Sequence, residues 1–348
     1  MNPTAHLERN DSRSGSGTRL GHITVLLMAW TSGQIFGQSS NVSAPISAAC
    51  IELNQLAMTQ VASGMLKEAE LALTAFLTSG ADQAEGACAG LVLNNLAAFM
   101  SISGRTVDGA RLAEQSVHTL EKVYSPNHPA LLRPLQIIAA TSVEQGLKGK
   151  AREAFKRMQS IRIQRPEDRA LLHGIAAVLS ETEGRPPEAE ADYLAALQEW
   201  QEAGKGQGAE AGVILCGLGS LYIKEDRLSE ARQALDRALA IFDSAKDAVS
   251  IDRIKLLYIR GVLQARQGDW QGAEQNLHEA LTMADREWLD PFTLRELLNN
   301  YAVVLRRNNH RREARSIEAR VAAIPVEGRR ATIVDITELL PKAKPLKK

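Results

Sequence analysis

The chain has 348 residues and a formal net charge of zero, from 41 Lys and Arg residues against 41 Asp and Glu residues. Apolar residues make up 45% of it but aromatic residues only 4%, which favours closely packed helices over a β-sandwich or barrel. The neutral total removes the simplest electrostatic argument for nucleic acid as the main ligand. The length predicts about two domains unless the chain is a repeat array.

The first element in chain order is a leader over residues 1–45. Its polar start contains three arginines, an apolar run occupies residues 23–30, and small and polar residues follow through Gly37. This form is typical of a secretory signal peptide, so it predicts export to the periplasm or the cell exterior. The alternative is a disordered leader on a cytoplasmic protein. Because the run is far shorter than the ~20 residues that span a bilayer, we expect no stable membrane span.

A turn-forming residue recurs through residues 46–322 at intervals of 38 to 42 residues. In all seven copies a small residue stands seven positions before it and another five positions after it. Small side chains let two antiparallel helices approach closely, and Gly, Asn and Asp tolerate left-handed turn angles. The pattern therefore predicts an all-α superhelical solenoid of seven αα-hairpins over residues 46–322. The turn residues are Gly64, Gly104, Gly146, Gly184, Asp226, Gly268 and Asn309.

The predicted first helices share a motif of Leu-x-x-Leu-small, in which the large residues are expected to fill the core. It occurs as LNQLA at residues 53–57, LNNLA at 93–97 and LNNYA at 298–302. The motif resembles that of tetratricopeptide repeat proteins, and the long copies are similar to the kinesin light chain type. The Trp that this family carries in the first helix is absent. The resemblance implies a concave face, lined by the first helices, that binds a peptide or protein.

Under this resemblance, the two positions after the conserved Leu of each first helix face the concave side. Amides there can donate to and accept from the backbone of an extended peptide whatever its sequence. The alternative is that they bond only to neighbouring helices or face water. We expect amides near both ends and a more apolar middle. The candidate ligand-binding residues are Asn54, Asn94, Asn95, Gln136, Tyr258, Asn299 and Asn300.

Charge is unevenly distributed although the total is zero. Residues 181–210 carry eight acidic residues against two basic ones, whereas residues 296–348 carry twelve basic against six acidic. The basic region includes a Lys- and Pro-containing tail over residues 323–348. It would attract an acidic partner or a membrane surface, or serve as the polar cap that a terminal repeat requires.

The three cysteines are too few for a disulfide scaffold and are not at metal-binding spacing. Cys50 and Cys88 open neighbouring first helices, so they are expected either to pair in an exported chain or to remain free thiols. Cys216 falls at a concave position, where it is either a small buried residue or a reactive thiol.

No catalytic or metal-binding motif occurs in the sequence: the seven histidines are dispersed, and HExxH, GxSxG and phosphate-loop patterns are absent. We therefore expect no enzymatic activity, no cofactor and no metal. The predicted function is a non-enzymatic protein-interaction scaffold. The alternatives are an accessory or regulatory subunit that positions a separate enzyme, and a structural factor in cell-envelope assembly. The sequence leaves the oligomeric state open.

Overall fold

The computed structural model of the chain describes residues 47–62, 65–79, 86–102, 105–244, 250–286, 289 and 291–324. Within these residues, fourteen α-helices follow one another in seven consecutive pairs, and there is no strand. This confirms the all-α solenoid of αα-hairpins. The leader over residues 1–45 lies outside the described residues, as does the C-terminal tail beyond Ile324.

Each pair consists of a first and a second helix joined by a short turn. The first helices are α1 (Ala48–Ala62), α4 (Gly86–Ile102), α6 (Leu132–Glu144), α8 (Pro166–Thr182), α10 (Ala209–Lys224), α12 (Ser250–Arg266) and α14 (Pro291–Arg307). The second helices are α2 (Leu66–Thr78), α5 (Thr106–Glu121), α7 (Lys148–Ser160), α9 (Pro186–Glu202), α11 (Leu228–Ser244), α13 (Trp270–Ala284) and α15 (Arg311–Ala323). A 3-10 helix, η2 (Pro129–Leu131), precedes α6.

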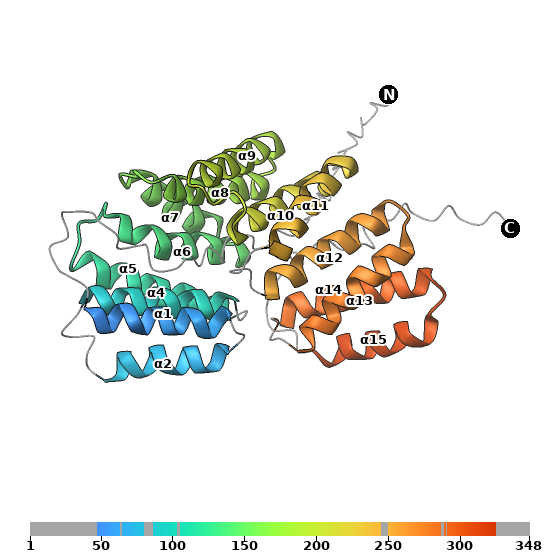
Figure 1. The fold of residues 1–348 in the computed structure, drawn as a ribbon, viewed down its shortest axis with the longest axis horizontal. Coiled ribbons are helices and arrows are strands. Elements are labelled where there is room, and N and C mark those ends of the chain that lie inside the picture. The colour runs from blue at the N-terminus through green and yellow to red at the C-terminus, as the bar shows by residue number, and fades with distance from the viewer. Residues whose placement is uncertain are drawn as a thin grey trace, which may run out of the picture.

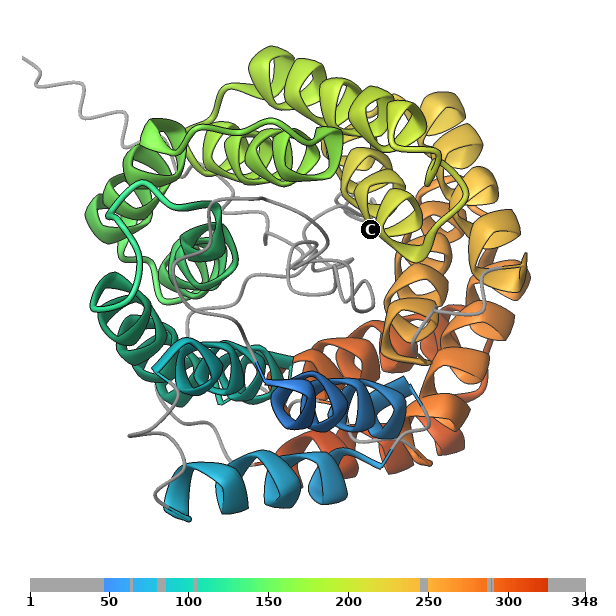
Figure 2. The ribbon, with the colours of Figure 1, turned by 60° about the vertical axis from the view of Figure 1, so that its left-hand side comes forward.

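The pairs stack side by side from α1 to α15 and curl into a superhelix (Figure 1). Figure 2 looks along the curl and shows the first helices on its inner side and the second helices on its outer side. We call the side lined by the first helices the inner face. The arrangement follows from the sequence because one hairpin cannot bury its apolar side alone and must stack on its neighbours.

The predicted turn residues adopt the left-handed backbone conformation wherever the structure describes them. Gly146, for example, has φ = 74°, and the N–H of Leu147 donates to the carbonyl of Ser142 at 2.8 Å, which closes the end of α6. Gly64 and Gly104 lie outside the described residues. The other turn residues with positive φ are Gly184 (74°), Asp226 (60°), Gly268 (81°) and Asn309 (65°).

The predicted small residues lie where paired helices approach most closely. Ala57, Ala69 and Ala139 have no exposed surface. At Gly219 an added Cβ would lie 2.7 Å from Cδ2 of Leu235 on the paired helix, closer than carbon atoms tolerate. Close packing therefore explains why every copy keeps a small residue at these positions.

The first repeat has a small core of its own. Cys50, Leu73 and Phe99 belong to a cluster formed by α1, α2 and α4, whereas a second, continuous cluster extends from α4 to α15. Leu56, expected to fill the core, is instead 51% exposed. The physical reason is that α1 is the first helix of the described part, so no earlier repeat packs against it there.

A disulfide ties this first repeat to the second. Cys50 of α1 and Cys88 of α4 are bonded, with their Cα atoms 5.9 Å apart. The sequence left two possibilities for these cysteines, a disulfide or two free thiols, and the structure has the disulfide. The third cysteine, Cys216, is free and buried, and burial raises the pKa of its thiol well above the usual value. The sequence left open whether Cys216 is a small buried residue or a reactive thiol. The structure favours the buried residue, because a thiol with a raised pKa is a poor nucleophile.

Candidate binding surface on the inner face

The seven predicted ligand-binding residues all lie on first helices, so they belong to the elements that line the inner face. They are distributed over α1, α4, α6, α12 and α14 and do not converge on one pocket. Such a distribution suits a long ligand that contacts several repeats. It does not suit a small molecule, which needs a few polar groups converging on one cavity.

Near the N-terminal end, the amides bond to one another across the first two repeats. The side-chain amide of Asn95 donates to Oδ1 of Asn54, and Nδ2 of Asn54 donates to the carbonyl of Cys50 at 2.8 Å. Nδ2 of Asn94 donates to Oδ1 of Asn95 at 3.3 Å. The remaining acceptor, Oδ1 of Asn94, is buried and has no hydrogen-bond partner among the described residues. Asn54 and Asn95 thus connect neighbouring helices, and Asn94 keeps an unused acceptor.

A similar connection joins α12 and α14. Nδ2 of Asn300 donates to the hydroxyl of Tyr258 at 2.5 Å, and both side chains are buried. Gln136 on α6 is also buried, whereas Asn299 is exposed. The structure therefore divides the predicted residues into those that bridge helices or are buried and those, Asn94 and Asn299, whose amides form no hydrogen bond to a neighbouring helix among the described residues.

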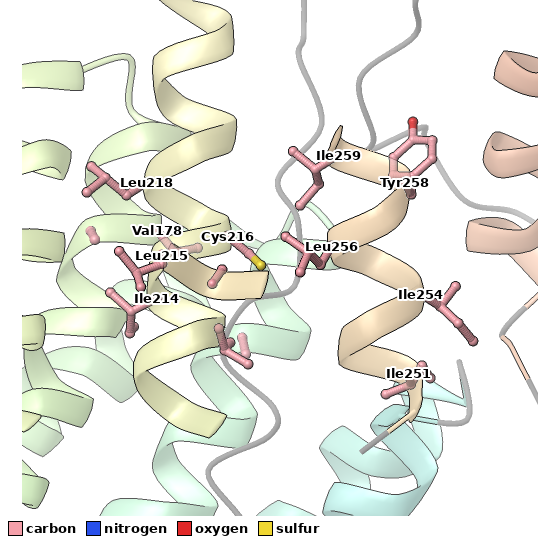
Figure 3. Close-up of a cluster of buried hydrophobic side chains, with 14 of the residues drawn as sticks. Val178, Ile214, Leu215, Cys216, Leu218, Ile251, Ile254, Leu256, Tyr258 and Ile259 are labelled. Atoms are coloured by element: carbon pink, nitrogen blue, oxygen red, sulfur yellow. The ribbon is translucent and has the colours of Figure 1, made fainter. Parts of the chain in front are cut away.

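The apolar residues expected in the middle of the inner face are buried. Ile137, Ile175 and Ile259 are each at most 5% exposed. Figure 3 shows Leu256 and Ile259 projecting from α12 on the side that faces Cys216 of α10. Much of this apolar surface therefore packs between neighbouring first helices, which fixes the spacing of the repeats.

Three acidic side chains on the inner helices were not singled out from the sequence. Asp168, Glu210 and Asp252 lie in the first turns of α8, α10 and α12 and are at most 5% exposed. Their spacing in the sequence could have identified them, because each stands 16 residues before the turn residue of its copy. Carboxylates in the first turn interact favourably with the helix dipole.

The acidic segment over residues 181–210 is largely paired with bases of its own repeat and of the two neighbouring repeats. Glu181 forms an ion pair with Lys224 at 2.8 Å, and both side chains are less than 10% exposed. Glu190 pairs with Arg227, whose guanidinium also lies over the ring of Tyr222 at 4.2 Å. The net charge of this segment is therefore offset by the neighbouring helices.

The described part of the basic end carries both paired and unpaired arginines. Arg306 pairs with Glu318 at 2.6 Å, and Arg320 pairs with Asp285 at 2.5 Å. Arg311 and Arg312 on the last helix are exposed and form no ion pair with the described residues. A polar outer helix of this kind keeps the end of a repeat array soluble.

A cavity of about 870 Å³ lies between α2, α4 and α5. Its lining includes Leu77, Ala89, Arg111, His118 and Lys122, and none of the seven predicted residues.

Across the described part of the chain, no cluster of three or more His, Cys, Asp or Glu side chains could hold a metal ion. Likewise, no helix of that part is both long enough and apolar enough to cross a membrane.

Comparison with known proteins agrees with this repeat architecture. Family models described as tetratricopeptide repeat match residues 91–130 and 167–244. No curated protein gives a significant match.

Several solved structures are similar in fold. The APC/C hetero-tetramer Cut9–Hcn1 matches with a TM-score of 0.57 at 11% identity, over 85% of this chain and 48% of that one. BtubC (BKLC) from P. vanneervenii matches with a TM-score of 0.49 at 22% identity, over 68% and 96% of the two chains. A tetratricopeptide repeat protein from Parabacteroides merdae matches with a TM-score of 0.45 at 15% identity, over 84% and 98%.

Proposed function

Because the chain is a tetratricopeptide repeat protein, we propose that it is a non-enzymatic scaffold that binds an extended segment of a partner protein along its inner face. Tetratricopeptide repeats generally mediate protein–protein interaction. The inner face is the surface to which every repeat contributes a helix, so a long segment can gain contacts from repeat to repeat.

The observation that carries this proposal is the unused amide capacity of Asn94 and Asn299. The acceptor of Asn94 is buried without a partner among the described residues, and the amide of Asn299 is exposed. An extended backbone offers both N–H and C=O groups, so it can bond to such amides without regard to its side chains. A buried acceptor that lacks a partner costs free energy. Asn94 is only partly buried, so a rotation of its side chain would bring this oxygen to a bound backbone N–H and remove that cost.

The bridging amides have a different role in this proposal. Asn54 with Asn95, and Tyr258 with Asn300, fix how neighbouring first helices stack. A binding surface with fixed geometry loses less conformational entropy when a ligand binds. These four residues therefore position the surface, while Asn94 and Asn299 contact the ligand.

Affinity capture with the full chain tests the proposal. The double variant Asn94→Ala/Asn299→Ala removes two amides that make few contacts within the protein, so the melting temperature should not change. Two lost hydrogen bonds should weaken partner capture by about tenfold. The control is Gln233→Ala, an exposed amide on the outer helix α11, which should leave capture unchanged. Equal capture by the wild type and the double variant would refute the proposed surface.

We also propose that the protein is exported. The Cys50–Cys88 disulfide supports an oxidising compartment, because reducing conditions in the cytoplasm keep most thiols free. The N-terminal sequence of the protein purified from its native host tests this. A mature chain that begins between residues 37 and 47 is expected, whereas an intact Met1 would contradict export. The identity of the captured partner distinguishes a general scaffold from an enzyme-positioning subunit or an envelope-assembly factor.

A further inference from the structure

The cavity between α2, α4 and α5 combines an apolar floor with a charged wall. Its volume of about 870 Å³ falls within the roughly 300–1,000 Å³ that is typical of ligand sites. Leu77 of α2, Leu93 of α4 and Val123, which follows α5, contribute apolar side chains that are only partly buried. Two of its walls, α2 and α5, are second helices, which lie on the outer side of the curl (Figure 2). We call this cavity the outer groove.

The charged wall is a row of basic side chains on α5. Arg111, His118 and Lys122 all line the outer groove and all are exposed, so a ligand can reach them. They are spaced by seven and four residues, which places them on one face of the helix. At 1.5 Å per residue, the row is about 16 Å long. We call these three residues the basic row.

The chain itself offsets little of this positive charge. Arg111 is the one member of the basic row that forms an ion pair with the described residues, and that pair, with Asp108, is long at 3.7 Å. The acidic residue of the lining, Glu114, is already paired with Lys150 on α7. The outer groove therefore keeps positive charge that is available to a ligand.

The repeat architecture does not require bases at these positions. The basic row stands 7, 14 and 18 residues after the turn residue Gly104. The equivalent positions of the six other copies carry a single basic residue, Arg286. A feature that served hairpin packing or solubility would recur from copy to copy, as the small residues do. The basic row is therefore particular to the second repeat, whose helices also form the cavity.

We propose that the outer groove binds an acidic segment of a protein partner. Its apolar side chains would lie on the floor, and its carboxylates would accept hydrogen bonds from the guanidinium of Arg111, the ammonium group of Lys122 and the ring of His118. A protein segment suits the site better than an anionic membrane, because the apolar surface is recessed between helices and does not project from them. This goes beyond the proposed function, since the outer groove contains none of the candidate residues of the inner face. One chain could thus connect two partners.

The probe is a library of random twelve-residue peptides displayed on phage and selected against the full chain. One class of selected peptides should bind Arg111→Glu/Lys122→Glu at least tenfold more weakly than the wild type. The matched control, Lys156→Glu/Arg237→Glu, makes the same change of charge at exposed bases of the outer helices α7 and α11 and should alter binding by less than twofold. Peptides of this class should carry at least two Asp or Glu residues together with apolar ones.

A charge swap separates loss of contact from loss of folding. One peptide of the class is synthesised with its acidic residues changed to Lys. It should bind poorly to the wild type and regain binding to Arg111→Glu/Lys122→Glu, which a misfolded variant could not achieve. The proposal is overturned if no selected peptide depends on these two bases, if the dependent peptides are not acidic, or if the swapped peptide fails to recover.

Two other occupants would also be recognised. Vesicles of phosphatidylcholine and phosphatidylserine that bind through the basic row, when no peptide does, would show a membrane ligand and contradict the proposal. Peptides that bind only to Asp82→Asn/Glu85→Gln, which neutralises the connection between α2 and α4, would assign the groove to the chain's own acidic residues instead. Asn94→Ala/Asn299→Ala should leave the acidic peptides unaffected, so failure of the inner face and failure of the outer groove are seen separately.

Discussion

The disulfide between Cys50 and Cys88 should hold the first repeat in place, and its removal should have a local effect. The bond closes a loop with a sequence separation of 38 residues. Loop-closure entropy for this length corresponds to about 4 kcal/mol at 25 °C. Since 1.4 kcal/mol is a factor of ten in an equilibrium constant, α1 and α2 should open about a thousandfold more often without it.

The effect should be local because of how the core is divided. The apolar residues of α1 and α2 pack in a cluster with α4, apart from the continuous cluster that extends to α15. In a repeat array each unit contacts only its neighbours, so a terminal unit can open while the others stay folded.

Amide hydrogen exchange measured by mass spectrometry checks this prediction. The variant Cys50→Ala/Cys88→Ala should exchange faster over residues 47–79 and at the wild-type rate over residues 209–244. A reductant should reproduce this pattern in the wild type and add nothing in the variant. Unchanged exchange in α1 and α2, or equal acceleration along the whole chain, would refute the reasoning.

Three further substitutions test the packing and electrostatics. Gly109→Ala places a Cβ 2.2 Å from Oγ of Ser101, so overpacking should lower stability by about 1–3 kcal/mol in denaturant unfolding. Asp252→Asn should stabilise the protein at pH 8 but not at pH 4. A folded pKa of about 7 lies above the usual value of 3.8, so the wild type loses up to about 4 kcal/mol as pH rises between them. Lys224→Ala removes the cation that neutralises the carboxylate of Glu181, whose side chain is 6% exposed, and should cost about 3–5 kcal/mol in the same assay.

Each of these substitutions has an outcome that contradicts its reasoning. Gly149→Ala is the control for Gly109→Ala, because nothing lies within 4 Å of an added Cβ there and stability should not fall. A similar loss in both variants would mean that close packing is not the cause. A constant difference between Asp252→Asn and the wild type from pH 4 to pH 8 would exclude titration of Asp252. Full stability of Lys224→Ala would show that its ion pair with Glu181 contributes nothing.

The fold was predictable from the sequence because its determinants are local and repeat. Gly146 and Asp226 mark turns with positive φ, and Ala57 and Ala69 mark the contact between two paired helices. These features depend on residues a few positions apart, and every copy repeats them. The prediction that Leu56 fills the core was wrong, since its side chain is exposed. Whether a residue at the end of an array is buried depends on whether another repeat stacks there.

The candidate site was predictable only in outline. The motif correctly placed Asn54, Asn95 and Asn300 on first helices, but nothing in it indicated that their amides bridge neighbouring helices. The burial of Asp252 and the pairing of Glu181 were not apparent for the same reason. Contacts of this kind join side chains about one repeat apart, and their geometry depends on the superhelical stacking angle.

The sequence by itself thus determined the hairpin, its period and the number of copies, because helix periodicity, turn chemistry and small-residue packing act within one repeat. The tertiary structure decided which charges are neutralised, which amides remain available and that Cys50 meets Cys88. These properties arise between repeats, where a small rotation per hairpin sets every distance across the inner face.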